Sequence, residues 1–154
     1  MLANFAKVHL GGEKNMYRIA ICDDDLVFGS LLEQYLQNFA KTRRIPIDVL
    51  VFARGEEYLE FLIEELPVDL IFLDIQFEKG LDGVQIGKEL RADIKNEMTQ
   101  IIYISGIESY AMQLFQNRPM DFLVKPVKQE RVDHIMEEYL RLFGNRNKQY
   151  FDYN

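Results

Sequence analysis

The sequence is poor in the residues that form disulfides and zinc sites. Its 154 residues include one cysteine, Cys22, and two histidines, His9 and His134. A single thiol cannot close a disulfide within the chain, and one thiol with two histidines cannot supply the four ligands of an ordinary structural zinc site. These shortages exclude a disulfide-stapled domain and a zinc finger. They favour a reducing compartment, which we expect to be the cytoplasm.

Positive charge and long apolar stretches are also scarce. Lys and Arg number 18 against 25 Asp and Glu, which gives a net charge of −7. A negatively charged chain is not attracted to a phosphate backbone or to an anionic membrane surface. No apolar run approaches the roughly 20 residues that a membrane-spanning helix needs. We therefore expect no nucleic-acid binding by this chain alone and no membrane insertion.

What the sequence does contain is a regular alternation of strand and helix patterns over residues 17–143. Short β-type runs occur at 17–22, 47–52, 69–74, 100–105 and 121–125. Apolar residues recur at helical spacing in five segments, at 28–39, 55–66, 86–94, 108–116 and 132–143. Strict alternation with short connections implies right-handed crossovers in an open, doubly wound parallel sheet. We predict a flavodoxin-like α/β domain with strand order 2-1-3-4-5 and five helices.

The two ends of the chain fit neither pattern. Residues 1–16 show no clear period, and Met16 stands directly before the first strand-like run. We interpret them as a leader or as a segment added for expression, with a short helix packed on the domain as the alternative. Residues 144–154 follow the last helical pattern and are interpreted as a C-terminal tail or a truncated linker.

Polar and charged residues stand where four of the expected strands end. They are Asp23 with Asp24, then Asp74, Ser105 and Lys125. In open parallel sheets, sites form beyond the carboxyl ends of the strands, where the strand order reverses. We therefore expect these five residues to meet at one edge of the sheet. Asp74 ends the strongly apolar stretch "VDLIFLD". A carboxylate in such a place either destabilises the fold or takes part in chemistry.

The residue types at this edge suit phosphoryl transfer to a carboxylate. Three close carboxylates repel one another, so keeping them ionised requires a cation, and hard oxygen ligands favour Mg²⁺ or Mn²⁺. A metal, a lysine and a hydroxyl together can neutralise the oxygens of a transferring phosphoryl group. Asp74 is the candidate nucleophile, which would form an acyl phosphate. Lys125 would pair with one phosphoryl oxygen and Ser105 would donate to another.

An ordered set of motifs, "ICDDD", "LIFLDI", "LDG", "IIYIS" and "FLVKP", resembles the receiver domain of bacterial two-component response regulators. The resemblance covers about residues 17–143. It implies that Asp23 and Asp24 are the acidic pair, with Asp24 the more direct metal ligand, and that Asp74 accepts the phosphoryl group. It also implies that the backbone carbonyl of Gln76 completes the metal ligands.

The same resemblance assigns a switch. Ser105 stands for the Thr or Ser of the family, Phe122 for its rotating aromatic residue, and Lys125 for its lysine, followed by Pro126 in a cis peptide bond. Phosphorylation is then expected to change the face formed by the helix at 108–116, the strand at 121–125 and the helix at 132–143. That face is a candidate homodimer interface. Such a domain assists its own phosphorylation and dephosphorylation and is not an enzyme with a separate substrate.

The stretch from Ser109 to Val127 further resembles receivers that precede LytTR-type DNA-binding domains. The resemblance implies a sensor histidine kinase as phosphodonor and transcription as output. No output domain follows in this sequence, and we expect either a natural single-domain regulator or, preferably, a fragment cut at the linker.

Alternatives remain at this point. Asp23 to Asp25 also fit the D-x-D nucleophile motif of haloacid-dehalogenase-like phosphatases, with Asp23 as nucleophile, although a later acidic pair and a cap are missing. A pseudo-receiver that binds a partner without phosphorylation is a third interpretation. Asp25 is best interpreted as a helix cap. Two departures from the family are a loop from Asp74 to Gly83 that is one residue longer than usual, and Pro119 before the last strand.

Overall fold

The computed structural model describes residues 16–77, 80–106 and 114–144. Its centre is a five-stranded parallel sheet in the order β2-β1-β3-β4-β5. The strands are β1 (Tyr17–Cys22), β2 (Ile47–Phe52), β3 (Leu70–Asp74), β4 (Gln100–Ser105) and β5 (Asp121–Val124). The predicted strand order and the parallel pairing are therefore confirmed, and so is the flavodoxin-like class.

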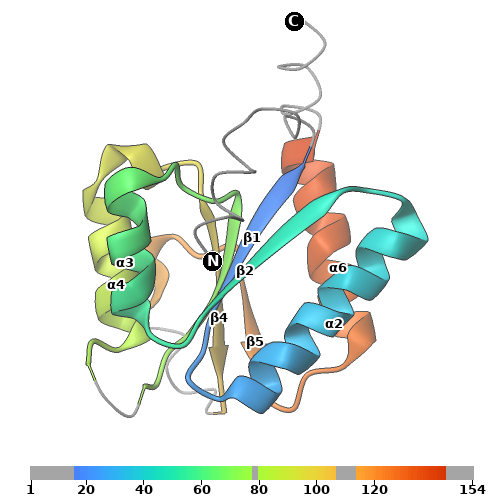
Figure 1. The fold of residues 1–154 in the computed structure, drawn as a ribbon, viewed down its shortest axis with the longest axis horizontal. Coiled ribbons are helices and arrows are strands. Elements are labelled where there is room, and N and C mark those ends of the chain that lie inside the picture. The colour runs from blue at the N-terminus through green and yellow to red at the C-terminus, as the bar shows by residue number, and fades with distance from the viewer. Residues whose placement is uncertain (1–15, 78–79, 107–113, 145–154) are drawn as a thin grey trace, which may run out of the picture.

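Helices cover both faces of this sheet, as Figure 1 shows. In the described residues the α-helices are α2 (Leu26–Arg43), α3 (Gly55–Glu64), α4 (Gly83–Ala92) and α6 (Gln129–Tyr139). Helices α3 and α4 lie side by side on one face, and α2 and α6 lie on the other. Short 3-10 helices span Ile94–Asn96 and Phe115–Asn117, and a short π-helix spans Leu140–Gly144. No helix among the described residues is long and apolar enough to cross a membrane.

The prediction of five helices is not met within the described part of the chain, which contains four α-helices. Residues 108–113 of the helix expected at 108–116 lie outside the described residues, and Phe115–Asn117 form a 3-10 turn. The predicted leader and tail fall outside them too, apart from Met16 and Gly144. These assignments stay predictions.

One helix boundary was wrong for a local reason. The pattern placed Ile94 on the buried face of the helix, but α4 ends at Ala92 and Ile94 is 83% exposed. The Asp93 side chain accepts a hydrogen bond from the Lys95 backbone N–H at 3.1 Å. Short polar side chains that bond to nearby backbone in this way compete with helix continuation.

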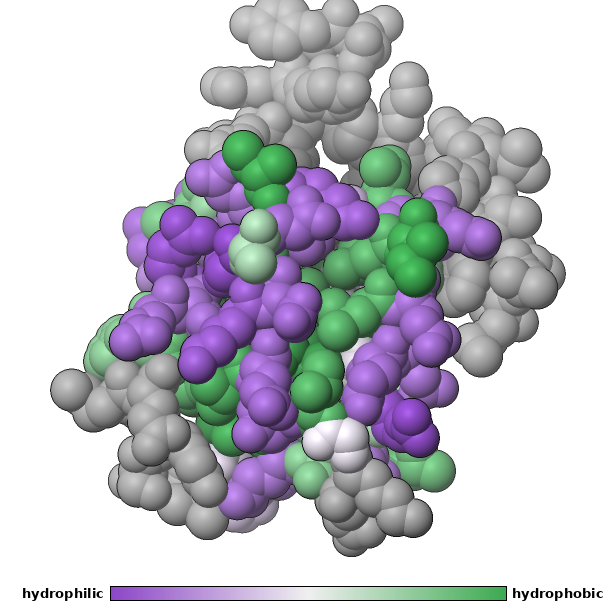
Figure 2. Space-filling model, turned by 90° about the vertical axis from the view of Figure 1, so that its left-hand side faces the viewer, coloured by the Kyte–Doolittle hydropathy of each residue, from purple (hydrophilic) through white to green (hydrophobic). Residues whose placement is uncertain are grey.

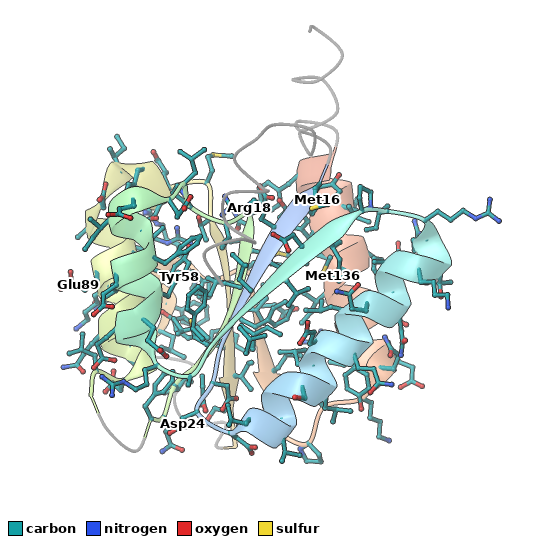
Figure 3. All side chains as sticks on the ribbon, in the orientation of Figure 1. Met16, Arg18, Asp24, Tyr58, Glu89 and Met136 are labelled. Carbon is teal, nitrogen blue, oxygen red and sulfur yellow. The ribbon has the colours of Figure 1, made fainter. Side chains whose placement is uncertain are left out.

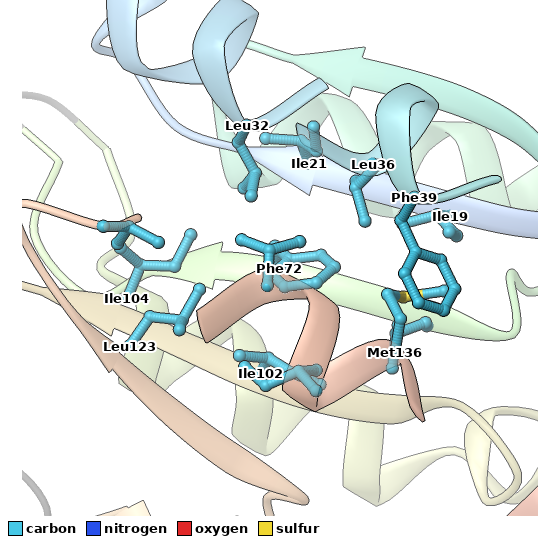
Figure 4. Packing of buried hydrophobic residues seen from close by; sticks show 14 of the residues in the cluster. Ile19, Ile21, Leu32, Leu36, Phe39, Phe72, Ile102, Ile104, Leu123 and Met136 are labelled. Atoms are coloured by element: carbon cyan, nitrogen blue, oxygen red, sulfur yellow. The ribbon is translucent and has the colours of Figure 1, made fainter. Parts of the chain in front are cut away.

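The apolar residues divide into two clusters, one on each face of the sheet. Along β1, Ile19 and Ile21 face α2 and α6, whereas Ala20 and Cys22 face α3 and α4. Figure 4 shows Leu32, Leu36 and Phe39 of α2 and Met136 of α6 packed with side chains from β1, β3, β4 and β5. Strand β3 is buried along its whole length, as expected for a central strand covered on both faces.

The outer surface of α3 and α4 is mostly hydrophilic, with hydrophobic residues visible between the polar ones (Figure 2). A groove of about 640 Å³ lies between the later parts of these helices. It is lined by Leu59, Leu62, Ile63, Glu89, Ala92, Asp93, Ile94, Lys95 and Asn96. None of these residues stands at the carboxyl end of a strand, so the groove is separate from the predicted site.

Candidate functional site

Three carboxylates meet at the carboxyl edge of the sheet, as the sequence predicts. Asp23 follows β1 and Asp74 ends β3, and these two strands are hydrogen-bonded neighbours. One oxygen each from Asp23, Asp24 and Asp74 can be chosen so that all three lie within 4.8 Å of one another. In Figure 3, Asp24 lies at one end of the sheet and Arg18 at the other. This set of hard oxygen donors fits Mg²⁺ or Mn²⁺.

A short hydrogen-bonded turn holds the first carboxylate in place. The Asp25 backbone N–H donates to Asp23 Oδ1 at 2.8 Å. Asp25 is itself the N-cap of α2, because its Oδ1 accepts from the Phe28 backbone N–H at 3.0 Å. The prediction that Asp25 caps this helix is confirmed, and Asp23 is fully buried.

Lys125 reaches into the carboxylate cluster from the end of β5. Its Nζ lies 3.1 Å from Asp23 Oδ2 and 3.6 Å from Asp74 Oδ2. The Lys125 backbone N–H donates to the Ser105 carbonyl oxygen at 2.8 Å, and the Lys125–Pro126 peptide bond is cis, as predicted. The lysine is thus placed by backbone contacts as well as by its ion pairs.

The charges of Asp23, Asp74 and Lys125 together favour a bound cation. Burial, and after it the neighbouring Asp23, raise the pKa of Asp74 to about 7 despite the lowering effects of the Gln76 N–H and of Lys125. Burial works to lower the pKa of Lys125, but Asp74 and Asp23 outweigh it and raise that pKa. One lysine therefore compensates two buried carboxylates only in part, which leaves net negative potential for a metal ion.

The remaining predicted residues lie at different distances from this centre. Ser105 ends β4 beside Asp74 and is 5% exposed, and the Gln76 N–H donates to Asp74 Oδ1 at 3.1 Å. Phe122 lies farther along the sheet, opposite Tyr103 in the β4–β5 register. Its ring stacks on Tyr103 with a centroid separation of 6.2 Å, and the Phe115 ring meets it edge-on, also at 6.2 Å. The structure therefore brings the carboxylates and Lys125 together and leaves Phe122 outside the ion-pair cluster.

Two residues near the site were not predicted from the sequence. The Phe28 ring lies under the Lys125 ammonium, with 4.4 Å between Nζ and the ring centroid. Glu56, in the first turn of α3, accepts a hydrogen bond from the Leu81 N–H at 3.1 Å and so supports the long loop after Asp74. In the sequence, Phe28 lies on the apolar face of the helix expected at 28–39, and Glu56 is one of several acidic residues of the helix expected at 55–66. Neither pattern signals a contact across the fold.

These features define a doubly wound α/β protein with a cluster of carboxylates and a lysine at the strand-order reversal. The family model of the response regulator receiver domain matches residues 19–137. The chain therefore belongs to the response regulator receiver family.

The relatives that this chain resembles include several proteins named sensory transduction protein LytT. The chain is 34% identical over 92 residues to the sensory transduction protein LytT of Oceanobacillus iheyensis, a match that covers 60% of this chain and 37% of that protein. The chain therefore spans well under half of this relative.

Solved structures share the fold. The response regulatory domain of mrkE from Klebsiella pneumoniae superposes with a TM-score of 0.72 at 21% identity, covering 83% of this chain and 98% of that one. TrrA from Thermotoga maritima, solved in complex with Mg²⁺-BeF, superposes with a TM-score of 0.67 at 25% identity, covering 81% and 100%.

Proposed function

We propose that the chain is the phosphoacceptor domain of a two-component response regulator and that Asp74 accepts the phosphoryl group. The observation that carries the proposal is the position of Asp74: its carboxylate lies 3.6 Å from Lys125 Nζ and within 4.8 Å of ligand atoms of Asp23 and Asp24. A carboxylate that is held at a cation site beside a lysine has the groups that stabilise a transferring phosphoryl group.

The residues take the following roles in this proposal. Asp23, Asp24, Asp74 and the backbone carbonyl of Gln76 would hold Mg²⁺, or Mn²⁺, and the ion would supply positive charge to offset the charge of the phosphoryl group. An Asp74 carboxylate oxygen attacks phosphorus, the bond from phosphorus to the donor nitrogen breaks, and the imidazole leaves with the electron pair. Lys125 pairs with one phosphoryl oxygen and Ser105 donates a hydrogen bond to another. Gly106 is exposed, and a Cβ at this position would meet no atom of the described residues within 4 Å, so the position leaves room for the donor.

The donor and the output follow from the family. A phosphohistidine on a cytoplasmic sensor histidine kinase is the proposed donor, since no histidine stands in the described site. Transcription control through a LytTR-type domain is the proposed output, and the match to a protein named sensory transduction protein LytT supports a role in signalling. The surface around β5 and α6 is the proposed homodimer interface.

The geometry disfavours the hydrolase alternative. Asp23 is fully buried, its Oδ1 accepts the Asp25 N–H, and its Oδ2 is paired with Lys125. A side chain with no exposed surface offers no oxygen to an incoming phosphorus atom, whereas the Asp74 side chain is 8% exposed. The pseudo-receiver alternative is weakened because the reactive positions are all filled.

The test is metal-dependent phosphorylation. Incubation with acetyl phosphate and Mg²⁺ is expected to add one phosphoryl group, detected by intact mass, whereas EDTA suppresses the gain. The physical reason is that without metal the Asp74 carboxyl, with its pKa raised to about 7, is partly protonated at neutral pH and its charge is poorly compensated. Equal phosphorylation with Mg²⁺ and with EDTA would contradict the proposed metal role. No phosphorylation in either condition would contradict the proposed function.

The switch is tested separately. We propose that Ser105 moves toward the phosphoryl group and that Phe122 turns into the space vacated, which biases a pre-existing equilibrium of the β5 surface. Phe122→Ala is expected to accept phosphate at nearly the unmodified rate but to lose most of the phosphorylation-induced dimerisation, measured by sedimentation. Val51→Ala, on β2 at the opposite edge of the sheet and 38% exposed, is the control. If Phe122→Ala dimerises like the parent protein, this coupling is wrong.

A further inference from the structure

The Lys125 ammonium has a third partner besides its two carboxylates. Its Nζ lies 4.4 Å from the centroid of the Phe28 ring. Cation–π attraction operates within about 6 Å of a ring centroid and is strongest where water is excluded. Phe28 is 9% exposed and the Lys125 side chain is 26% exposed, so the contact is largely shielded from solvent.

Backbone hydrogen bonds fix the position of the ring. Phe28 is the third residue of α2, and its N–H donates to the capping carboxylate of Asp25 at 3.0 Å. The Asp25 N–H in turn donates to Asp23 at 2.8 Å. The ring is therefore linked through two short hydrogen bonds to the same carboxylate that pairs with Lys125.

The segment that carries the lysine is also tied to α2. The Tyr35 hydroxyl, two turns beyond Phe28, donates to the Val127 carbonyl oxygen at 3.1 Å. The Gln129 side-chain amide donates to the Tyr35 carbonyl oxygen at 2.8 Å. These contacts bridge α2 and the chain that follows Lys125, so the distance between ring and ammonium is set on both sides.

We propose that Phe28 is a positioning residue, whose ring face holds the Lys125 ammonium at the place where it meets the incoming phosphoryl group. The proposal rests on the proposed function, because it concerns the same lysine. A lysine side chain is flexible and strongly hydrated. An unrestrained lysine therefore loses conformational entropy when it pairs with one phosphoryl oxygen. The attraction to Asp74 changes when an Asp74 oxygen becomes part of an acyl phosphate. The ring is chemically unchanged by that reaction and keeps the ammonium in place throughout.

Stepwise fluorination of the Phe28 ring tests this proposal. Fluorine withdraws electron density from the ring face while changing its shape little, so it weakens the cation–π attraction and leaves packing nearly intact. The ligand is beryllofluoride with Mg²⁺, a stable substitute for the phosphoryl group, and its affinity is measured by titration calorimetry. The affinity is expected to fall progressively from Phe through mono-, di- and trifluorophenylalanine, by roughly three- to tenfold over the series.

The control is the same series at Phe72. This residue is fully buried in the same hydrophobic cluster, and the described part of the chain places no cation over its ring. Fluorination there is expected to leave the affinity for beryllofluoride unchanged. Equal affinity across the Phe28 series, or an equal fall in the Phe72 series, would overturn the positioning role.

A second measurement separates ring electronics from packing. Phe28→Leu removes the ring but keeps an apolar side chain, and Phe28→Tyr keeps an aromatic face. The Lys125 ε-protons are expected to be shifted upfield by the ring in the parent protein, both without ligand and with beryllofluoride, and to lose that shift in Phe28→Leu. Loss of the shift when beryllofluoride binds to the parent protein would show that the ammonium leaves the ring, which overturns the proposal. Failure of the parent protein to bind beryllofluoride at all would instead contradict the proposed function.

Discussion

Replacing Asp74 by asparagine is expected to abolish phosphorylation by acetyl phosphate. The amide has nearly the same shape as the carboxyl group, but it carries no nucleophilic oxygen anion, so no acyl phosphate can form. Asp74 is 5% exposed at the end of a fully buried strand, and the substitution is expected to preserve the fold. The measurement is intact mass after incubation with acetyl phosphate and Mg²⁺.

The same substitution is expected to change stability with a defined pH dependence. The pKa of Asp74 in the folded protein, about 7, lies above its ordinary value of 3.8, so the folded state binds the proton more tightly than the unfolded chain does. The parent protein therefore loses stability as pH rises from about 4 to about 7, and the loss is complete above that range. Asp74→Asn removes the titrating group. Its unfolding midpoint in the absence of metal is expected to exceed that of the parent at pH 8 and to approach it at pH 4.

Asp23→Asn is the matched control, because it changes the other carboxylate that pairs with Lys125. It is expected to weaken metal binding and slow phosphorylation without removing the acceptor, so a phosphoryl group still appears after longer incubation. Phosphate on Asp74→Asn together with none on Asp23→Asn would reverse the assignment and return the hydrolase alternative.

Gly83→Ala is expected to produce the largest loss of stability. A Cβ at this first position of α4 would overlap the Asp74 carbonyl oxygen and lie 2.7 Å from Ile75 Cα. Alanine gains at most about 1 kcal/mol over glycine in a helix, and overlap with backbone atoms costs more, because backbone cannot move aside like a side chain. We expect a net loss of roughly 2–4 kcal/mol in urea unfolding. The phosphorylation rate should fall as well, since the overlap displaces the backbone of the acceptor residue.

Gly29→Ala provides the comparison within a helix. The nearest atom to its Cβ would be Val51 Cγ1 at 3.9 Å, which is ordinary contact. The substitution is expected to leave stability unchanged or to raise it by up to about 1 kcal/mol, with an unchanged phosphorylation rate. Similar unfolding midpoints for Gly83→Ala and Gly29→Ala would show that the loop after Asp74 yields more easily than the structure implies.

Much of this fold was predictable because the strands carry simple patterns. Residues 70–73 are apolar on both faces, a pattern that predicts a central strand covered on both sides. The charged residues at the strand ends predict the edge of the sheet where the site lies. The cluster of Asp23, Asp24, Asp74 and Lys125 followed from topology, because parallel strands deliver their carboxyl ends to one place. Ile94 was misplaced because the Asp93 side chain accepts a hydrogen bond from the Lys95 N–H, which competes with continuation of the helix.

The contacts of Phe28 and Glu56 could not be predicted in the same way. Each joins residues that are distant in the sequence and that ordinary patterns assign to a core and to a solvated surface. The distance between a ring and an ammonium depends on how α2 settles on the sheet, and periodicity carries no information about it. Such contacts emerge only from the assembled side chains.

The order of the site residues along the chain also determines the order in which the site assembles during synthesis. The carboxylates come from β1 and β3, whereas their positive partner comes from the end of β5, the last strand made. Synthesis proceeds from the N-terminus, so the carboxylates of Asp23, Asp24 and Asp74 leave the ribosome well before Lys125 does. Until β5 docks, the carboxylates repel one another without this counter-charge, so completion of the acceptor site and neutralisation of its charge coincide with the docking of β5.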